Sequence, residues 1–253
     1  MNFFDSIILG IIEGITEFLP ISSTAHLILT ADLLGLSQSE FLKSFEIIIQ
    51  FGAILAVVVL YWKLFLKWEV LKKLIVAFIP TGILGLIFYK IIKTYFLEST
   101  SLILWTLFLG GIFLIIFEKW HKEKENASED IANISYKHCF YIGLFQSIAM
   151  IPGISRSATT ILGGLLIGLR RKTIVEFSFL LAVPTMLVAS GFDLLNNIEK
   201  FSLSESHLLA VGFITSFGMA ILGIKFFLAY IQKRTFIAFG IYRIIIVILF
   251  LVK

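Results

Sequence analysis

The chain has 253 residues, of which 58% are hydrophobic and only 15% are charged. A soluble domain carries about 25% charged residues, so a soluble globule of this length has too few charges to cover its apolar side chains. Disordered, collagen-like and disulfide-rich proteins are excluded as well, because the chain has 26 Phe but only 4 Pro and 1 Cys. The composition therefore predicts an all-α polytopic membrane protein. Basic loops beside a membrane explain the net charge of +4 better than a nucleic-acid partner does.

A helix that crosses a bilayer needs about 20 consecutive apolar residues. Six segments have this character, near residues 45–62, 74–92, 101–117, 174–193, 207–230 and 236–252. We therefore expect six transmembrane helices in a single integral membrane domain that covers residues 1–253.

Two further apolar regions, 1–37 and 137–171, are each interrupted by a polar stretch that contains a proline. The stretches read LPISST at 19–24 and IPGISRS at 151–157. The helical piece on either side has about 15 residues, which is too short to span a membrane. Broken backbone at membrane depth is tolerated only where protein or a water-filled cavity surrounds it. We therefore predict two re-entrant helix hairpins whose breaks lie inside the bundle.

The two halves of the chain resemble each other. GIIEGI at 10–15 aligns with GLFQSI at 143–148, and ISSTA at 21–25 aligns with ISRSA at 154–158 at the same spacing. Repeat one covers about 1–117 and repeat two about 137–253, and a polar cytoplasmic loop at about 118–136 joins them. Each repeat holds one hairpin and three spans. Because three is odd, the second repeat is inverted, which is the plan of many transporters with a site where the repeats meet.

The positively charged loops predict the orientation, because Lys and Arg are enriched on the cytoplasmic side of a membrane. The side reached after the first span carries Lys63, Lys67, Lys72, Lys73, Lys119, Lys122, Lys124, Lys137, Arg170, Arg171, Lys172, Lys233 and Arg234. The opposite side carries Lys43, Lys90, Lys93, Lys200 and Lys253. We expect the first side to be cytoplasmic and both termini to be external. The first hairpin then opens outward and the second opens inward.

Glu13 and Glu17 are four residues apart on a predicted helix, so their carboxylates share one face. An ionisable group at the centre of a membrane helix costs roughly 2.5–3.5 kcal/mol, which makes such a pair unusual. The two carboxylates repel unless a divalent cation, an arginine or a shared proton lies between them. The simpler alternative is a polar helix face at a water boundary.

A cluster of polar residues follows the acidic pair, namely Ser22, Ser23, Thr24 and His26. A serine after Pro20 is typical of a helix start, where its side chain caps the first turn. That structural role is compatible with function, because the free N–H groups of a helix N-terminus favour anions such as phosphate. A lone His is usually a packed or capping residue. Beside hydroxyls and carboxylates, His26 can also be a general base, a general acid or a metal ligand.

Arg156 lies at the tip of the second break, between Ser155 and Ser157, with Thr160 one helical turn later. A guanidinium donates two parallel hydrogen bonds, and together with hydroxyls and a helix start it suits a phosphate ligand. The alternative is an ion pair with one of the two glutamates that holds the halves of the chain together.

Other polar residues in the spans are less informative. Glu46 and Gln50 share a face of the first predicted span, and both can line the same cavity; the alternative for Glu46 is a place at the membrane interface. Lys225 and Arg243 lie in later spans, and we assign neither to the site, because a lysine can extend its head to the membrane surface.

The stretches EGITEFLPISSTAH (13–26) and PGISRSATT (152–160) resemble the two signature motifs of the bacterial undecaprenyl-diphosphate phosphatases of the bacitracin-resistance type. FEIIIQFGAILAVV (45–58) resembles a third characteristic stretch, so the resemblance covers essentially the whole chain. It implies an integral membrane enzyme that removes the terminal phosphate of undecaprenyl diphosphate at the outer face of the cell membrane. The enzyme uses a divalent cation, magnesium or calcium, and recycles the carrier lipid for cell-wall synthesis.

The resemblance carries the family's acidic pair, hydroxyl cluster, histidine and arginine onto this chain. The implied catalytic residues are Glu13, Glu17, Ser23, His26 and Arg156, with Glu13 and Glu17 as metal ligands. The residues expected to contact substrate are Ser22, Thr24, Gln50, Ser155, Ser157 and Thr160. The nucleophile is either a hydroxyl, with Ser23 the first choice, or a metal-bound water, and His26 or a Glu moves the proton. Ala158 stands where a Gly is common in the family. The expected partners are the lipid substrate and the bilayer, with no nucleic acid, and a homodimer is left open.

A transporter or flippase of an anionic lipid is the main alternative, because an inverted repeat with paired hairpins also serves alternating access. The clustering of acids, hydroxyls, histidine and arginine exceeds what binding alone requires, and the resemblance favours the phosphatase. Hydrolysis outside, followed by return of the product inside, would combine the two activities. A purely structural membrane protein would not retain such buried charges.

Overall fold

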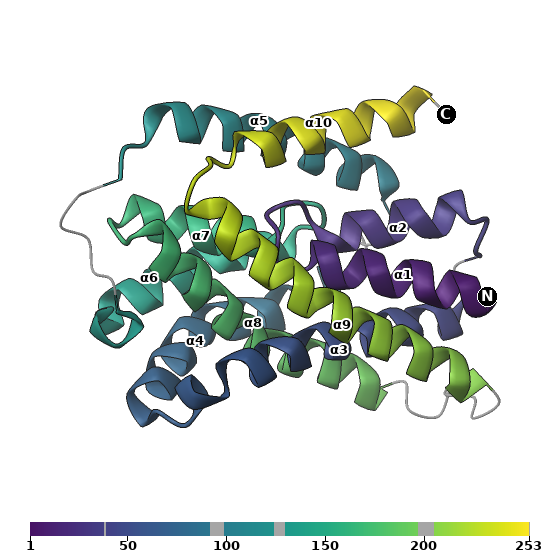
Figure 1. Cartoon of the computed structure of the whole chain (residues 1–253), viewed down its shortest axis with the longest axis horizontal. Coiled ribbons are helices and arrows are strands. Elements are labelled where there is room, and N and C mark those ends of the chain that lie inside the picture. Colours follow the sequence, from purple (N-terminus) through teal and green to yellow (C-terminus); the bar gives the residue numbers. More distant parts are fainter. Residues whose placement is uncertain (38, 92–98, 124–129, 197–204, 253) are drawn as a thin grey trace.

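The computed structural model describes residues 1–37, 39–91, 99–123, 130–196 and 205–252, and every regular element in these ranges is a helix. The α-helices are α1 (Phe3–Thr16), α2 (Ser23–Leu33), α3 (Glu40–Phe65), α4 (Trp68–Ile91), α5 (Thr100–Trp120), α6 (Tyr136–Ser147), α7 (Arg156–Leu166), α8 (Arg171–Asn196), α9 (Ser206–Ile231) and α10 (Ile237–Val252). Two short 3₁₀ helices, η2 (Ile131–Asn133) and η3 (Ile148–Met150), precede and follow α6. The helices lie roughly along the longest axis of the molecule (Figure 1).

Five helices are long and apolar enough to cross a membrane, namely α3, α4, α5, α8 and α9. Together with α10 they coincide with the six predicted apolar segments. Helix α10 is shorter than a typical span, because it has 16 residues. The predicted loop at 118–136 is too long, since α5 continues to Trp120 and η2 lies within it. Residues 92 and 124–129, and the basic residues Lys93, Lys124, Lys200 and Lys253, lie outside the described residues.

The starts of several helices follow from side-chain caps. At α1 the Asn2 side chain accepts a hydrogen bond from the Asp5 N–H at 3.0 Å, and the Asp5 carboxylate accepts one from the Asn2 N–H at 2.6 Å. Ser39, Ser99 and Ser135 cap α3, α5 and α6 in the same way with their hydroxyl oxygens. Each cap satisfies a backbone N–H that has no partner inside its helix.

Both predicted helix breaks are present, between α1 and α2 and between α6 and α7. The N-cap residues Ser22 and Ser155 have φ angles of +69° and +82°. This left-handed region is unfavourable for a residue with a Cβ and costs about 1–3 kcal/mol. The Ser155 hydroxyl caps α7 by accepting a hydrogen bond from the Ala158 N–H at 3.2 Å, whereas the Ser22 side chain makes no such cap. The Ser22 hydroxyl, in the break between α1 and α2, is therefore not used to cap α2.

The order of short and long helices recurs in the second half of the chain. Helices α2 and α7 both have 11 residues, and α3 and α8 both have 26. The glycines that follow α2 and α7, Gly35 and Gly168, have φ angles of +66° and +90°. In Figure 1 the α1–α2 pair lies toward one end of the long axis and the α6–α7 pair toward the other, so that the two breaks face each other near the middle.

Glycines allow the closest helix contacts. A Cβ on Gly14 of α1 would lie 2.7 Å from the Met219 Cβ of α9, and a Cβ on Gly111 of α5 would lie 2.7 Å from the Gly240 carbonyl oxygen of α10. Small residues at such contacts let the backbones of membrane helices approach each other. Helices α5 and α10 form a separate layer on one side of the bundle (Figure 1).

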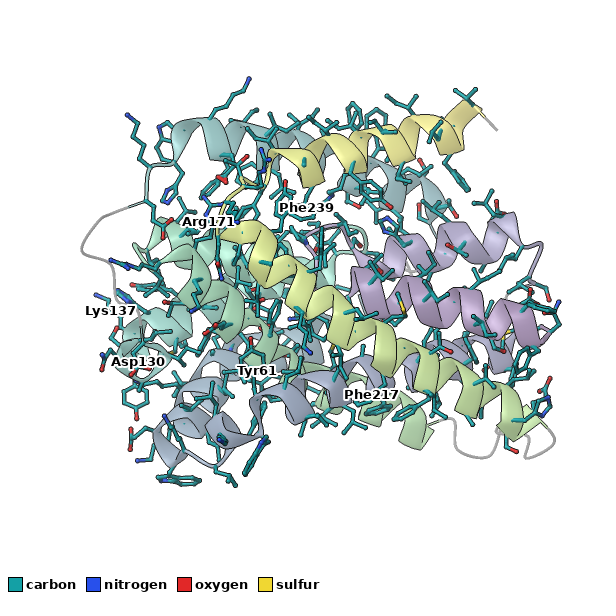
Figure 2. All side chains as sticks on the ribbon, viewed as in Figure 1. Tyr61, Asp130, Lys137, Arg171, Phe217 and Phe239 are labelled. Carbon is teal, nitrogen blue, oxygen red and sulfur yellow. The ribbon has the colours of Figure 1, made fainter. Side chains whose placement is uncertain are left out.

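The chain termini and a group of charged residues mark opposite ends of the long axis. The N- and C-termini lie at the same end (Figure 1). Asp130, Lys137 and Arg171 lie at the other end (Figure 2). At that end Arg171 forms an ion pair with Glu118, which ties the start of α8 to the end of α5.

Candidate active site

A cavity of about 250 Å³ lies between the two helix breaks. From the first break and α3 it is lined by Glu17, Ser22, Ser23, Thr24 and Gln50. From η3 and the second break it is lined by Ala149, Met150, Pro152, Gly153, Ser155 and Arg156, and from α4, α6 and α8 by Thr81, Gln146, Thr185, Met186, Ala189 and Ser190. The structure thus brings seven of the eleven predicted site residues to one cavity (Glu17, Ser22, Ser23, Thr24, Gln50, Ser155 and Arg156).

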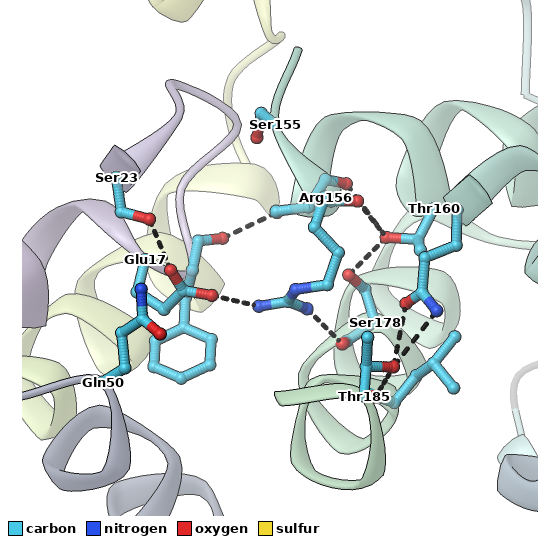
Figure 3. Close-up of polar contacts among 12 residues, drawn as sticks. Glu17, Ser23, Gln50, Ser155, Arg156, Thr160, Ser178 and Thr185 are labelled. Atoms are coloured by element: carbon cyan, nitrogen blue, oxygen red, sulfur yellow. Dashed lines mark hydrogen bonds and ion pairs between the residues drawn. The ribbon is translucent and has the colours of Figure 1, made fainter. Parts of the chain in front are cut away.

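Glu17 is the point where the two breaks meet. One of its carboxylate oxygens accepts a hydrogen bond from the Ser23 hydroxyl at 2.5 Å, and the other accepts one from Arg156 Nη2 at 2.7 Å (Figure 3). The side chains of Arg156 and Glu17 are only 12% and 7% exposed. The alternative given for Arg156, an ion pair with one of the two glutamates, is therefore observed, and the partner is Glu17.

One nitrogen of the Arg156 guanidinium makes no hydrogen bond within the described part of the chain. Its Nη1 donates to the Ser178 carbonyl oxygen at 2.9 Å. Its Nε is buried and has no hydrogen-bond partner within the described part of the chain. A buried donor without a partner is costly, so this N–H is a candidate contact for an oxygen of a ligand in the cavity.

Glu13 is fully buried, and neither of its carboxylate oxygens has a hydrogen-bond partner among the described residues. The charged groups that act on it are Glu17, Glu46 and Arg156. A buried carboxylate without a partner is unfavourable, and a cation or a proton would relieve it.

The donor chemistry around Glu13 fits a hard divalent cation. Carboxylate, hydroxyl and amide oxygens are the ligands that magnesium and calcium prefer. No cluster of three His, Cys, Asp or Glu side chains suited to a metal occurs in the described ranges. A cation held by the two glutamates would therefore take its remaining ligands from other oxygens, such as those of substrate phosphates and water.

Ser157 and Thr160 lie behind the cavity wall rather than on it. The Ser157 hydroxyl donates to the Phe18 carbonyl oxygen at 2.8 Å, which ties the second break to the first. The Thr160 hydroxyl lies 2.6 Å from the Ser178 hydroxyl, so it ties α7 to α8 (Figure 3). Both residues therefore connect the elements around the cavity and do not line it.

His26 is also absent from the cavity wall, and both of its ring nitrogens have partners. Nδ1 lies 2.7 Å from the Ser22 carbonyl oxygen, and Nε2 lies 2.9 Å from the Tyr242 hydroxyl. Because a carbonyl can only accept, Nδ1 carries the proton in this contact. The imidazole ring is stacked on the Tyr242 ring, with centroids 5.5 Å apart. His26 therefore reaches the cavity through the backbone of Ser22.

Several polar residues of the cavity were missed by the sequence reasoning. Gln146 Nε2 donates to the hydroxyls of Thr81 at 2.9 Å and Thr185 at 3.1 Å, and the Ser190 hydroxyl donates to Gln50 Oε1 at 3.0 Å. The alignment of the two repeats already pairs Gln146 with Glu13, so the repeat was a usable signal for Gln146. Thr81 and Thr185 each directly follow a proline inside an apolar span, Pro80 and Pro184, a feature that was not used in predicting the site.

Residues 6–249 match the family described as bacitracin resistance protein BacA. The chain belongs to this family. It is 52% identical over 250 residues to an undecaprenyl-diphosphatase of Sulfurihydrogenibium sp., a match that covers 99% of this chain and 98% of that protein. An undecaprenyl-diphosphatase of Persephonella marina is 53% identical over 252 residues, with the same coverage. One of Aquifex aeolicus is 49% identical over 247 residues, covering 97% of this chain and 96% of the relative. The family and the long apolar helices together make the chain a multi-pass membrane protein.

Proposed function

We propose that this chain is an undecaprenyl-diphosphatase that works in the cavity between its two helix breaks. It hydrolyses undecaprenyl diphosphate to undecaprenyl phosphate and inorganic phosphate. This recycles the carrier lipid for cell-wall synthesis and gives resistance to bacitracin. Full-length identity of about half to proteins of that name supports the reaction. The contact of Glu17 with both Arg156 and Ser23 is the observation that carries the assignment of the site.

The proposed architecture is six membrane spans and two re-entrant hairpins in an inverted repeat. The equal lengths of α2 and α7 and of α3 and α8 support it, as do the matched positive φ angles of Ser22 and Ser155. The protein lies in the bacterial cell membrane, with both termini and the active site on the outer side. The termini lie at one end of the long axis (Figure 1), and Lys137 and Arg171 lie at the other end (Figure 2), which agrees with this orientation.

Arg156 binds the phosphates of the substrate. Its buried Nε–H and the N-termini of α2 and α7 supply donors for phosphate oxygens. Ser22, Thr24, Gln50 and Ser155 line the same cavity and complete the set of hydrogen-bonding groups. The prenyl tail, which is apolar, stays between helices in the lipid.

Glu13 and Glu17 would hold the divalent cation, magnesium or calcium. When bound, the cation offsets the charge that develops on the transferred and leaving oxygens. The oxygens of Glu13 support this assignment, because neither accepts a hydrogen bond from the described residues. Arg156 forms an ion pair with Glu17.

Ser23 is the nucleophile in our proposal. Its hydroxyl already donates to Glu17, so Glu17 can take the proton while Ser23 Oγ bonds to the terminal phosphorus. The bond from that phosphorus to the bridging oxygen breaks, and undecaprenyl phosphate leaves. Water then attacks the phosphoserine, which releases inorganic phosphate and restores Ser23. His26 holds the Ser22 carbonyl, and so the backbone beside the nucleophile, in place.

Phosphate release from undecaprenyl diphosphate by the purified protein tests the function. We expect release by the wild type, its loss in the presence of a chelator, and a fall of at least about 100-fold in Glu17→Gln. Glu69→Gln is the matched control, because Glu69 is an exposed carboxylate bonded to Lys72 far from the cavity. Movement of the lipid across a bilayer without phosphate release would support the transporter instead.

A further inference from the structure

We propose that Tyr242 and Arg243, consecutive residues of α10, are positioning residues for this hydrolysis. Arg243 holds the backbone of the second break, and Tyr242 holds His26 and through it the backbone of the first break. One helix outside the cavity thereby sets both breaks at once. The inference rests on the proposed phosphatase function.

Arg243 is a buried arginine whose contacts are backbone carbonyls. It is 1% exposed. Its Nη2 donates to the Gly153 carbonyl oxygen at 2.6 Å, and its Nε donates to that of Leu107 at 3.1 Å. Within the described part of the chain no carboxylate lies within ion-pair distance of it. The guanidinium is therefore stabilised by carbonyl oxygens of α5 and of the second break.

The second break is held at two consecutive carbonyls. The Thr106 hydroxyl of α5 donates to the Pro152 carbonyl oxygen at 2.6 Å, next to the Gly153 carbonyl that Arg243 binds. Gly153 has a φ of +88°, and a Cβ there would lie 2.7 Å from the Ile103 carbonyl oxygen. Pro152 and Gly153 both line the cavity, and only Ile154 separates Gly153 from Ser155 and Arg156. Their attachment to α5 and α10 therefore sets the position of Arg156, the first residue of α7.

The α5–α10 interface is shaped around the guanidinium of Arg243. A Cβ on Gly110 would lie 2.8 Å from Arg243 Cζ, and a Cβ on Gly111 would lie 3.1 Å from Arg243 Cβ. The two consecutive glycines thus leave the space that the arginine fills.

Tyr242 makes the matching contact with the first break. Its hydroxyl lies 2.9 Å from His26 Nε2, and His26 Nδ1 lies 2.7 Å from the Ser22 carbonyl oxygen. Because Nδ1 is the donor to that carbonyl, the neutral imidazole accepts at Nε2, and the Tyr242 hydroxyl donates. Ser22, with its positive φ, is the residue before Ser23. Tyr242 therefore stabilises the strained backbone next to the proposed nucleophile.

Positioning residues act on the rate rather than on the contacts with substrate. A displacement of about 1 Å can cost roughly 100-fold in rate when a catalytic group is moved from its productive position. Arg243 and Tyr242 touch neither the cavity nor the substrate. Their loss should lower kcat more than it raises KM.

Three conservative variants test the inference, namely Arg243→Lys, Thr106→Val and Tyr242→Phe. We expect kcat for phosphate release from undecaprenyl diphosphate to fall about tenfold or more in Arg243→Lys and Thr106→Val, and about fivefold in Tyr242→Phe, with KM within about threefold of wild type. Lys225→Met and Tyr230→Phe on α9 are the controls. Lys225 is exposed, and the Tyr230 ring packs on Phe239 5.0 Å away. Both controls should keep wild-type kcat.

A double variant separates positioning from a general loss of structure. If Arg243 acts through the position of Arg156, Arg243→Lys combined with Arg156→Lys loses less activity than the product of the single losses. Multiplicative losses, or wild-type kcat in Arg243→Lys and Thr106→Val, would overturn the inference. If Arg243→Lys does not fold, the kcat of Thr106→Val tests the inference instead, because this variant removes only the hydroxyl that binds the Pro152 carbonyl. Absence of phosphate release by the wild type would instead overturn the proposed function.

Discussion

At the scale of single residues, the site depends on one carboxylate with two partners. Glu17 accepts from Ser23 and from Arg156, which lies 139 residues later in the chain. Both contacts need the backbone of a helix break, and both breaks contain a serine in the left-handed region. Strained backbone of this kind is common at functional sites, where the surrounding structure holds it in place.

The role of Ser23 can be tested by removing its hydroxyl. We expect Ser23→Ala to lower phosphate release at least about 1000-fold, because the nucleophile of a covalent route is lost. Ser135→Ala is the control, since Ser135 caps α6 with its hydroxyl at 3.2 Å from the His138 N–H, outside the cavity. Near-wild-type turnover in Ser23→Ala would exclude the covalent route and assign the attack to water.

The strain at Ser22 predicts a difference between two variants that both lack the hydroxyl. Ser22→Gly should be more stable than Ser22→Ala by about 1 kcal/mol, because only alanine places a Cβ in the left-handed region at φ +69°. Thermal unfolding of the two purified variants in the same detergent measures this difference. A Ser22→Ala protein as stable as Ser22→Gly would contradict the argument.

At the scale of the elements, the short helix pairs are positioned by close contacts with long helices. Helix α1 lies against α9, where Gly14 faces the backbone of Ser216 and Ala220. Helix α6 lies against α4, where Gly143 faces the Ala77 backbone. These contacts leave no room for a side chain, so each short helix has one depth at which it fits.

A pair of glycine variants tests the contact between α1 and α9. Gly14→Ala should lower the unfolding temperature and activity together, because a Cβ there would lie 2.8 Å from the Ala220 backbone nitrogen. Gly218→Ala, on α9, meets nothing within 4 Å and should be neutral or slightly stabilising. The comparison is made by thermal unfolding and phosphate release of both variants. Equal behaviour of the two would refute the close contact.

At the scale of the whole molecule, the orientation in the membrane is the main prediction. Cys139 is the single cysteine and is fully buried, so an introduced cysteine can be labelled selectively. A membrane-impermeant thiol reagent applied to intact cells should label Lys43→Cys and not Lys72→Cys. Breaking the cells should make both react.

The two positions are well matched. Lys43 and Lys72 are both exposed, and each pairs with a glutamate three residues earlier on its own helix. A difference in labelling therefore reports the side of the membrane rather than local burial. Labelling of Lys72→Cys in intact cells would reverse the orientation, and with it the outward opening of the first hairpin.

Much of the helical plan could be predicted from the sequence, because it depends on local features. Apolar segments long enough to span a bilayer, and serines that cap helix starts, act within a few residues. The breaks near Pro20 and Pro152 were also predicted from local features, namely a proline and polar residues within an apolar region. The motifs around Glu13 and Arg156 indicated the family. The end of α5 was placed too early, since its last turn contains charged residues such as Glu118, which pairs with Arg171 across the fold.

Tertiary structure alone decided which of these polar residues meet. Both Glu13 and Glu17 were candidate partners of Arg156, but only Glu17 pairs with it while Glu13 stays buried without a hydrogen bond. His26 contacts the hydroxyl of Tyr242, which is 216 residues away, and Arg243 donates a hydrogen bond to a carbonyl of the second break. The physical reason is that helical periodicity determines which residues share a face. Which face meets which neighbour depends on how far one helix can slide along another. Close contacts at glycines such as Gly14 and Gly111 fix that position.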